Sequence, residues 1–189
     1  YYLIKEVSLG NDGNISMENL KNCINNDLAN NFGNLCQRVF SFLERNCSGK
    51  IPKPTKLEKI DLDLINNLTD SVDELIADMN KQDLNNYLKK VVEFSFSANK
   101  YFNDLEPWVL KKTNIDRMNN ILYTIITQIK NISILLSPII PISSEKILDI
   151  MNLKKEDSLL ESISKKNVFD YNIEFKKTSI LFKKIENDN

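Results

Sequence analysis

The segment IDRMNNILYTIITQIKNISILL, residues 115–136, decides the fold. Its apolar residues cover much of the circumference of a helix, so we expect a helix of about Ile115–Leu136 that lies at the centre of the molecule. The following Ser137-Pro138-Ile139-Ile140-Pro141 ends this helix, because proline cannot continue it. A central helix needs other helices around it, and the rest of the sequence offers them.

The longest amphipathic pattern lies upstream and predicts one helix from Ser16 to Cys47. Ser16 is suited to the N-cap and Gly49 to the left-handed position that follows a helix end. Gly33, in the middle, predicts a slight bend or close packing. Apolar residues recur at the steps of three and four that are typical of a buried helix face: Leu20, Ile24, Leu28, Phe32, Leu35, Val39 and Phe42.

Two further helices lie between these segments. Apolar periodicity predicts one over Asp61–Asn80 and another over Gln82–Leu105, which Pro107 interrupts. After the central helix, Ser143 or Ser144 is suited to cap a short helix that runs through Met151.

The last segment of the chain, 152–189, differs from the rest. It is polar with short apolar runs, and we expect an extended tail with some ordered contacts. The fold class is therefore all-α, a helical bundle of about five helices with a C-terminal extended tail.

Composition excludes several classes of function. The 189 residues carry a formal net charge of −1, so the chain is not basic throughout, although local charge matters more than the sum for RNA binding. There is no histidine and no glycine-rich phosphate loop, and we expect no catalytic residue in this chain. The longest apolar run, Ile132–Ile142, is too short to span a bilayer, so we expect no membrane partner.

The cysteines predict neither a metal site nor a disulfide framework. Cys23, Cys36 and Cys47 are odd in number and widely spaced. Without histidine, a zinc site would need three thiolates and a carboxylate. We expect thiols buried in a protein of the reducing cytoplasm, and no metal or cofactor bound to this part of the chain.

Charge is sorted along the chain. Eight acidic residues and two lysines lie between Glu58 and Asp83, so this helix should repel phosphate and face away from any RNA. Two regions are basic and would form the floor of an RNA site. They are the end of the first helix with its linker (Arg38, Arg45, Lys50, Lys53, Lys56) and the segment after Trp108 (Lys111, Lys112, Arg117).

Three segments together resemble methionyl-tRNA synthetases. DLANNFGNLCQR, residues 27–38, is similar to the first helix of that family's anticodon-binding domain. Tyr101-Phe102 followed by EPWVLK, residues 106–111, is similar to its Pro-Trp segment, and LLSPIIP, residues 135–141, to its Leu-Leu-x-Pro turn. The resemblance covers Tyr1 to about Leu153, and residues 180–185 resemble the family's C-terminal return.

The resemblance implies a division into three parts. Residues 1–15 would end the stem-contact region that leads to a catalytic domain, residues 16–153 would be the helical anticodon-binding domain, and residues 154–189 a tail that packs back on the bundle. We expect the chain to start inside a larger ATP-dependent ligase that charges tRNA(Met) with methionine. ATP and Mg²⁺ would bind the catalytic domain, so this chain alone is expected to be inactive.

The implied partners are the anticodon loop of tRNA(Met) and the synthetase's own catalytic domain, in the cytoplasm, with no DNA. Asn34 and Arg38 lie four residues apart, on one side of a helix. An amide and a guanidinium offer the donors and acceptors that suit the Watson–Crick edge of an unstacked base. Trp108 follows a proline at a helix boundary, from where an indole can be exposed. The resemblance implies that Trp108 stacks on the first anticodon base, a cytosine, while Asn34 and Arg38 bind anticodon bases and select CAU.

Alternatives stay open for each of these residues. Trp108 could be a core anchor, and Asn34 could be one of many asparagines on a solvated face. Arg38 could pair with Glu44 or Asp27, or be solvated. Phosphate contacts are a hypothesis whose alternative is solvated surface: Arg45, Lys111, Lys112 and Arg117.

Two other functions also stay open. One is a helical protein-interaction scaffold with apolar grooves, and the other is the anticodon domain of a cysteinyl- or leucyl-type synthetase. Convergence of Trp108, Asn34 and Arg38 on one exposed surface would favour RNA recognition over a scaffold.

Overall fold

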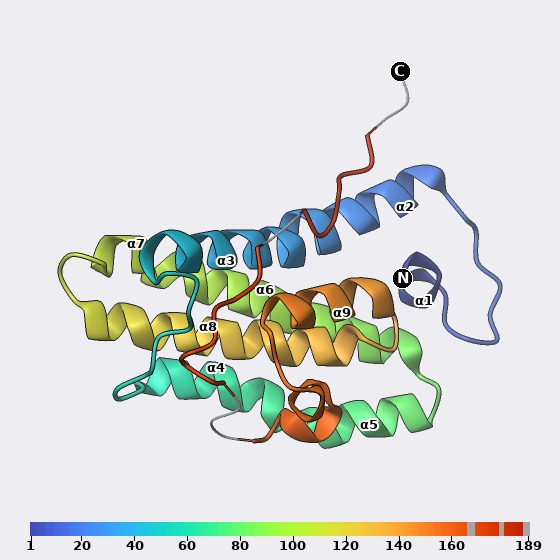
Figure 1. The fold of residues 1–189 in the computed structure, drawn as a ribbon. Coiled ribbons are helices and arrows are strands. Elements are labelled where there is room, and N and C mark those ends of the chain that lie inside the picture. The colour runs from blue at the N-terminus through green and yellow to red at the C-terminus, as the bar shows by residue number, and fades with distance from the viewer. Residues whose placement is uncertain (166–168, 178–179, 187–189) are drawn as a thin grey trace.

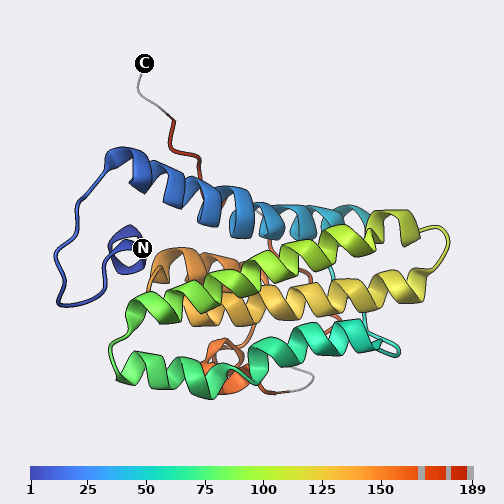
Figure 2. The same ribbon diagram turned by 180° about the vertical axis from the view of Figure 1, so that it is seen from behind.

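A computed structural model describes residues 1–165, 169–177 and 180–186. The longer helices form three layers, seen from opposite sides in Figures 1 and 2. The first layer is a rod made of α2 (Met17–Cys23), a π-helical segment (Ile24–Gly33) and α3 (Asn34–Asn46). The middle layer holds α6 (Leu84–Leu105) and α8 (Ile115–Leu136), and the third holds α4 (Lys59–Thr69) and α5 (Val72–Asn80).

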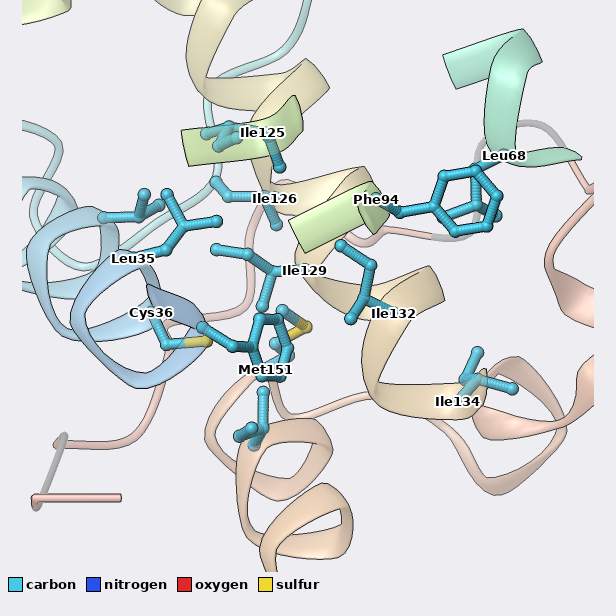
Figure 3. Close-up of a cluster of buried hydrophobic side chains, with 14 of the residues drawn as sticks. Leu35, Cys36, Leu68, Phe94, Ile125, Ile126, Ile129, Ile132, Ile134 and Met151 are labelled. Carbon is cyan, nitrogen blue, oxygen red and sulfur yellow. The ribbon is translucent and has the colours of Figure 1, made fainter. Parts of the chain in front are cut away.

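The central position predicted for α8 is confirmed. The helix has the predicted bounds, and sixteen of its residues are buried. α3, α4, α6 and α9 (Pro141–Ile150) all pack against it. Figure 3 shows its isoleucines inside a cluster with side chains of the surrounding elements: Ile125, Ile126, Ile129 and Ile132 lie among Leu35, Cys36, Leu68, Phe94 and Met151.

The rod corresponds to the helix predicted from Ser16 to Cys47. Ser16 is its N-cap, and its hydroxyl accepts a hydrogen bond from the Asn19 amide at 3.3 Å. Gly49 follows its end with a φ of +69°, and its amide donates to the Leu43 carbonyl at 3.0 Å. The π-helical geometry of the middle, in which the Asn34 amide reaches back five residues to Ala29, was not predicted.

Gly33 provides the close packing that the sequence predicts. A Cβ atom at this position would lie 2.7 Å from the Leu28 carbonyl oxygen and 2.7 Å from the Phe182 ring. The missing side chain therefore lets the C-terminal tail close against the rod.

Two sequence-based predictions of helix ends are wrong. Asp61–Asn80 is not one helix, because α4 ends at Thr69 and α5 begins at Val72. At this break the Ser71 amide donates to the Leu68 carbonyl at 3.1 Å and the Ser71 hydroxyl to the Asn67 carbonyl at 2.7 Å, which tightens the turn. Neither Ser143 nor Ser144 caps α9, since proline at position 141 already occupies its first turn.

The described part of the tail packs back on the bundle. It includes two short 3₁₀ helices, Lys155–Ser158 and Leu160–Ser162, which the sequence did not predict. The Phe175 amide then donates to the Gly49 carbonyl at 2.8 Å. Further along, the Ile185 amide donates to the side chain of Asn25 on the rod, also at 2.8 Å.

The N-terminal segment is anchored to the rod by one carboxylate. Helix α1 (Tyr2–Glu6) packs against α6, and the hydroxyl of Tyr1 and the ammonium of Lys5 both donate to buried Asp27. Burial and the hydrogen bond to Asp27 raise the pKa of Tyr1.

All three cysteines carry free thiols, with Cys23 and Cys36 buried as expected and Cys47 half-buried. In the described ranges, none of the helices combines the length and the apolar character needed to cross a membrane.

Lys130 is a charged residue inside the most buried helix. Its side chain is 1% exposed, and its ammonium donates to the Ser162 carbonyl at 2.9 Å. Burial lowers the pKa of Lys130 from 10.5 to about 8. Lys130 therefore links the central helix to the tail, and the free energy needed to bury its side chain depends on whether the ammonium is protonated.

We predict that Lys130 makes stability rise with pH in the mildly alkaline range. Between the folded pKa of about 8 and the unfolded value of 10.5, the unfolded chain binds more protons, so raising the pH favours the folded state. The free energy of unfolding of the wild type relative to Lys130→Met should increase by about 2 kcal/mol between about pH 7.5 and about pH 9.5.

Urea unfolding at both pH values measures this difference. Lys146→Met, at an exposed position of α9, is the control and should show no such change. An unchanged difference for Lys130→Met would mean that this lysine is not desolvated in the folded chain.

Candidate nucleic-acid interface

The turn between α6 and α8 presents Trp108. Glu106 ends α6 in the left-handed conformation, with a φ of 42°, and Pro107 opens the short helix α7 (Pro107–Leu110). Proline suits this position because its φ is already helical and it needs no amide partner. Trp108, the next residue, is half-buried, so the reading of Trp108 as an enclosed core anchor does not hold.

Arg38 and Trp108 meet over a buried ring. The guanidinium carbon of Arg38 lies 5.6 Å from the centroid of the Trp108 ring and 5.2 Å from that of Phe102. Phe102 and Trp108 pack edge to face, with centroids 5.6 Å apart and an angle of 73° between the rings. Cation–π attraction and the ring contact therefore hold Arg38 and Trp108 in a fixed relation. Neither Glu44 nor Asp27 forms an ion pair with Arg38 within the described part of the chain.

A hollow of about 520 Å³ opens beside this cluster, and we call it the Trp108 hollow. Arg45 and Lys111, two of the predicted phosphate contacts, line it together with Arg38 and Trp108, and both are exposed. The residues that line it are Gln37, Arg38, Ser41, Phe42, Arg45, Asn46, Phe102, Trp108 and Lys111.

Asn34 and Lys112 lie outside this hollow. Asn34 is exposed at the start of α3, one helical turn before Arg38, and does not line the hollow. Lys112 is exposed in the turn before α8 and lines a second hollow that adjoins the first. The structure thus brings together Arg38, Trp108, Arg45 and Lys111, while the roles of these residues in RNA binding stay predictions.

Arg117 does not belong to this surface, and its prediction as a phosphate contact is corrected. Its guanidinium makes two hydrogen bonds to the carboxylate of Asp61, at 2.6 and 2.9 Å, and a further ion pair with Glu58 at 3.4 Å. Tyr101 donates to the same carboxylate at 2.5 Å. The arginine pairs with a buried acid that lies 56 residues away in the chain, which a run of basic residues in the sequence could not reveal.

The buried carboxylate of Asp61 stays ionised because of these partners. Burial alone would raise its pKa, but hydrogen bonds from Arg117 and Tyr101 outweigh this effect and hold the pKa below its ordinary value. Asp61, Tyr101 and Arg117 come from α4, α6 and α8, so the group joins these helices near the turn that carries Trp108.

Sequence reasoning missed two residues that shape the Trp108 hollow. Phe102 was named only as part of the Pro-Trp segment and not as a site residue, although both Arg38 and Trp108 pack against its ring. Gln37 was not singled out, and its side-chain oxygen is buried without a hydrogen-bond partner among the described residues. The sequence signal for Gln37 was its spacing of four residues from Ser41, which places both on one helix face. In the structure the Gln37 amide donates to the Ser41 hydroxyl at 3.3 Å.

The acidic helices lie on the far side of the bundle from this surface. α4 and α5 are separated from α3 by the layer of α6 and α8, as Figures 1 and 2 show. That RNA approaches the opposite side stays a prediction. Within the described ranges, no group of three or more Cys, Asp or Glu side chains is arranged to hold a metal ion.

Comparison with known proteins identifies the family. Residues 51–189 match a family model described as the anticodon binding domain of methionyl tRNA ligase. The chain belongs to this family. Residues 1–40 match a second model, that of class I tRNA synthetases of the methionine type.

Individual relatives agree with this membership. A methionine–tRNA ligase of Rickettsia felis is 33% identical over all of this chain, and one of Brucella suis is 37% identical over 80% of it. The apo methionyl-tRNA synthetase of Mycobacterium tuberculosis superposes with a TM-score of 0.93 at 26% identity, over all of this chain. The chain spans 37%, 29% and 38% of the lengths of these three proteins.

Membership of the methionyl-tRNA ligase family decides against the cysteinyl- and leucyl-type alternatives. Phe102, Trp108 and Lys111 of the Trp108 hollow fall within the residues that match the anticodon-binding domain, whereas Arg38 falls within the match to the synthetase model. The convergence that would favour RNA recognition over a protein scaffold is met by Trp108 and Arg38, which line one hollow, but not by Asn34, which lies outside it.

We predict that Arg117 acts on stability. Arg117→Ala leaves the carboxylate of Asp61 buried with only Tyr101 as a side-chain donor, which should lower the free energy of unfolding by about 3 kcal/mol. Arg45→Ala, at an exposed position of α3, should change it by less than about 0.5 kcal/mol.

Urea denaturation of the two variants beside the wild type measures both values. Equal stability of Arg117→Ala and the wild type would contradict the buried ion pair.

Proposed function

We propose that this chain recognises the anticodon loop of tRNA(Met), with the sequence CAU, as part of an ATP-dependent ligase that attaches methionine to that tRNA. The observation that carries the proposal is the cluster of Arg38, Phe102 and Trp108 at the Trp108 hollow. Membership of an anticodon-binding domain family supports it. The other implied partner is the catalytic domain of the same synthetase.

The cluster suits recognition of an unstacked base. Trp108 lines the hollow with an indole, a surface on which a base of single-stranded RNA can stack. Phe102 and Arg38 hold this indole in place before RNA arrives, so little ordering is needed on binding.

Arg38 supplies the discrimination between bases. A cytosine presents acceptors at its O2 and N3 atoms, and a guanidinium is a rigid set of donors that can reach both. The cation–π contacts fix where this guanidinium lies. Asn34, exposed one turn earlier on the rod, would offer both a donor and an acceptor to a second anticodon base.

The phosphates of the loop would meet the exposed cations Arg45, Lys111 and Lys112. The free thiols fit a reducing compartment, and we place the parent protein in the cytoplasm. ATP and Mg²⁺ would activate methionine on the catalytic domain, and the chain itself would select and position the tRNA. We therefore expect it to bind RNA without aminoacylating it.

We predict that Trp108→Ala removes the preference for CAU without unfolding the bundle. Loss of one stacked base costs about 1–3 kcal/mol of binding, and the indole is only half-buried where it packs against the core, so the bundle should still fold. Titration of the wild type and the variant with anticodon stem-loops of CAU and of altered first base measures the preference, and thermal melting measures stability.

Phe96→Ala provides a matched control, because Phe96 is an exposed aromatic residue of α6 that lies outside the Trp108 hollow. It should leave the preference for CAU unchanged. If the wild type binds all stem-loops equally, the methionine anticodon is not what this chain recognises.

A further inference from the structure

We propose that the second hollow, next to the Trp108 hollow, is a subsite for the neighbouring nucleotide of the same single-stranded RNA. This inference rests on the proposed function. We call the hollow the Ile115 subsite. It lies between the end of α3, the linker that follows it, and the turn that leads into α8, and its volume is about 510 Å³.

The subsite has an apolar floor. Ile51 and Met118 are buried beneath it, and Pro52 is half-buried beside them. Ile115, at the start of α8, lines the side of the subsite, and its side chain is 59% exposed. An exposed isoleucine on an apolar floor gives the flat face of a base a surface to lie on, whereas isolated surface isoleucines have no such backing.

The polar groups around this floor suit the edge of a base. The amide of Asn119 is half-buried and makes no hydrogen bond with another described residue. Asn46 donates to the Phe42 carbonyl at 2.9 Å, which leaves its side-chain oxygen as an acceptor. Amides serve as both donors and acceptors, and this is what the mixed edge of a nucleobase requires.

Positive charge surrounds the subsite. Lys50, Lys111 and Lys112 line it, all three are exposed, and none forms an ion pair in the described ranges. No acidic side chain lines it. An apolar floor, amides and lysines together match the base, edge and phosphate of a nucleotide better than they match an apolar peptide.

The two hollows adjoin each other, because Asn46 and Lys111 line both of them. A base on Trp108 and a base in the Ile115 subsite would therefore be neighbours. The phosphate that joins two such nucleotides would pass Lys111. The occupant is therefore a nucleotide that flanks the one stacked on Trp108.

The test combines protein variants with RNA that lacks single bases. Ile115→Ser should weaken binding of the CAU stem-loop about fivefold to tenfold, because it removes the apolar surface but leaves the exposed helix start intact. An RNA with an abasic site at one of the two nucleotides that flank the first anticodon position should lose affinity to a similar extent. Ile115→Ser should then have no further effect on this RNA, since the two changes remove the same contact.

Ile142→Ser is the matched control. Ile142 is 70% exposed on α9 and lines neither hollow, so its substitution should leave the affinity for every RNA unchanged. The proposal of a subsite would be overturned if the losses of affinity from Ile115→Ser and from an abasic site were additive at both flanking positions.

A second measurement tests the phosphate contact. Lys112→Ala should reduce the slope of log Kd against log salt concentration by about 0.7, the value for one phosphate of a single strand. Lys146→Ala, on α9, should not change it. An unchanged slope for Lys112→Ala would mean that Lys112 does not contact a phosphate of the RNA.

The two proposals can fail separately. If Trp108→Ala abolishes the CAU preference while Ile115→Ser and Lys112→Ala bind as the wild type, the subsite is wrong and anticodon recognition stands. If the wild type shows no CAU preference but Ile115→Ser weakens RNA binding about fivefold, the subsite stands without that specificity.

Discussion

The burial of α8 on nearly all its sides is the constraint on which the rest of the structure depends. A helix with sixteen buried residues cannot lie on a surface, so layers must cover it. Some of its buried polar residues then bind the elements that surround it, because a buried polar group needs a hydrogen-bond partner. Asn120 binds the backbone of Thr55 and Lys56 in the linker, and Gln128 donates to the carbonyl of Leu64 on α4. Apolar area provides the stability, and these bonds fix the register.

The same helix determines where the candidate binding surface lies. α6 and α8 run side by side and are joined by the turn with α7, so Trp108 must lie at that end of the middle layer. The ion pair of Asp61 with Arg117 fastens the start of α8 to α4, while Phe102 on α6 supports the indole from below. Arg38 reaches the cluster from α3. The candidate site is thus a meeting point of three helices, and a rigid bundle keeps its parts in place.

The long helices and the family could be predicted from sequence because they depend on local patterns. α8 has its predicted bounds, and α6 starts within two residues of the prediction. What sequence missed depends on contacts between distant residues. The π-helical stretch accompanies buried Asp27 and Asn31, whose partners lie on the N-terminal segment and on α6. In the sequence Arg117 is one of several basic residues, and only the fold brings Asp61 beside it. Trp108 and Arg38 could be proposed from motifs, but the support of Phe102 could not.

Net charge says little about RNA binding in this protein, and the fold explains why. The chain is almost neutral in sum, yet the bundle places its two acidic helices in one outer layer and the cations Arg38 and Arg45 in the other. The middle layer of α6 and α8 lies between them, and salt weakens the interaction of exposed charges that lie more than about 10 Å apart. The acidic layer therefore does not cancel the attraction of the basic one for phosphate. The acidic face of α4 and α5 repels phosphate, which agrees with the prediction that RNA would approach the opposite side of the bundle.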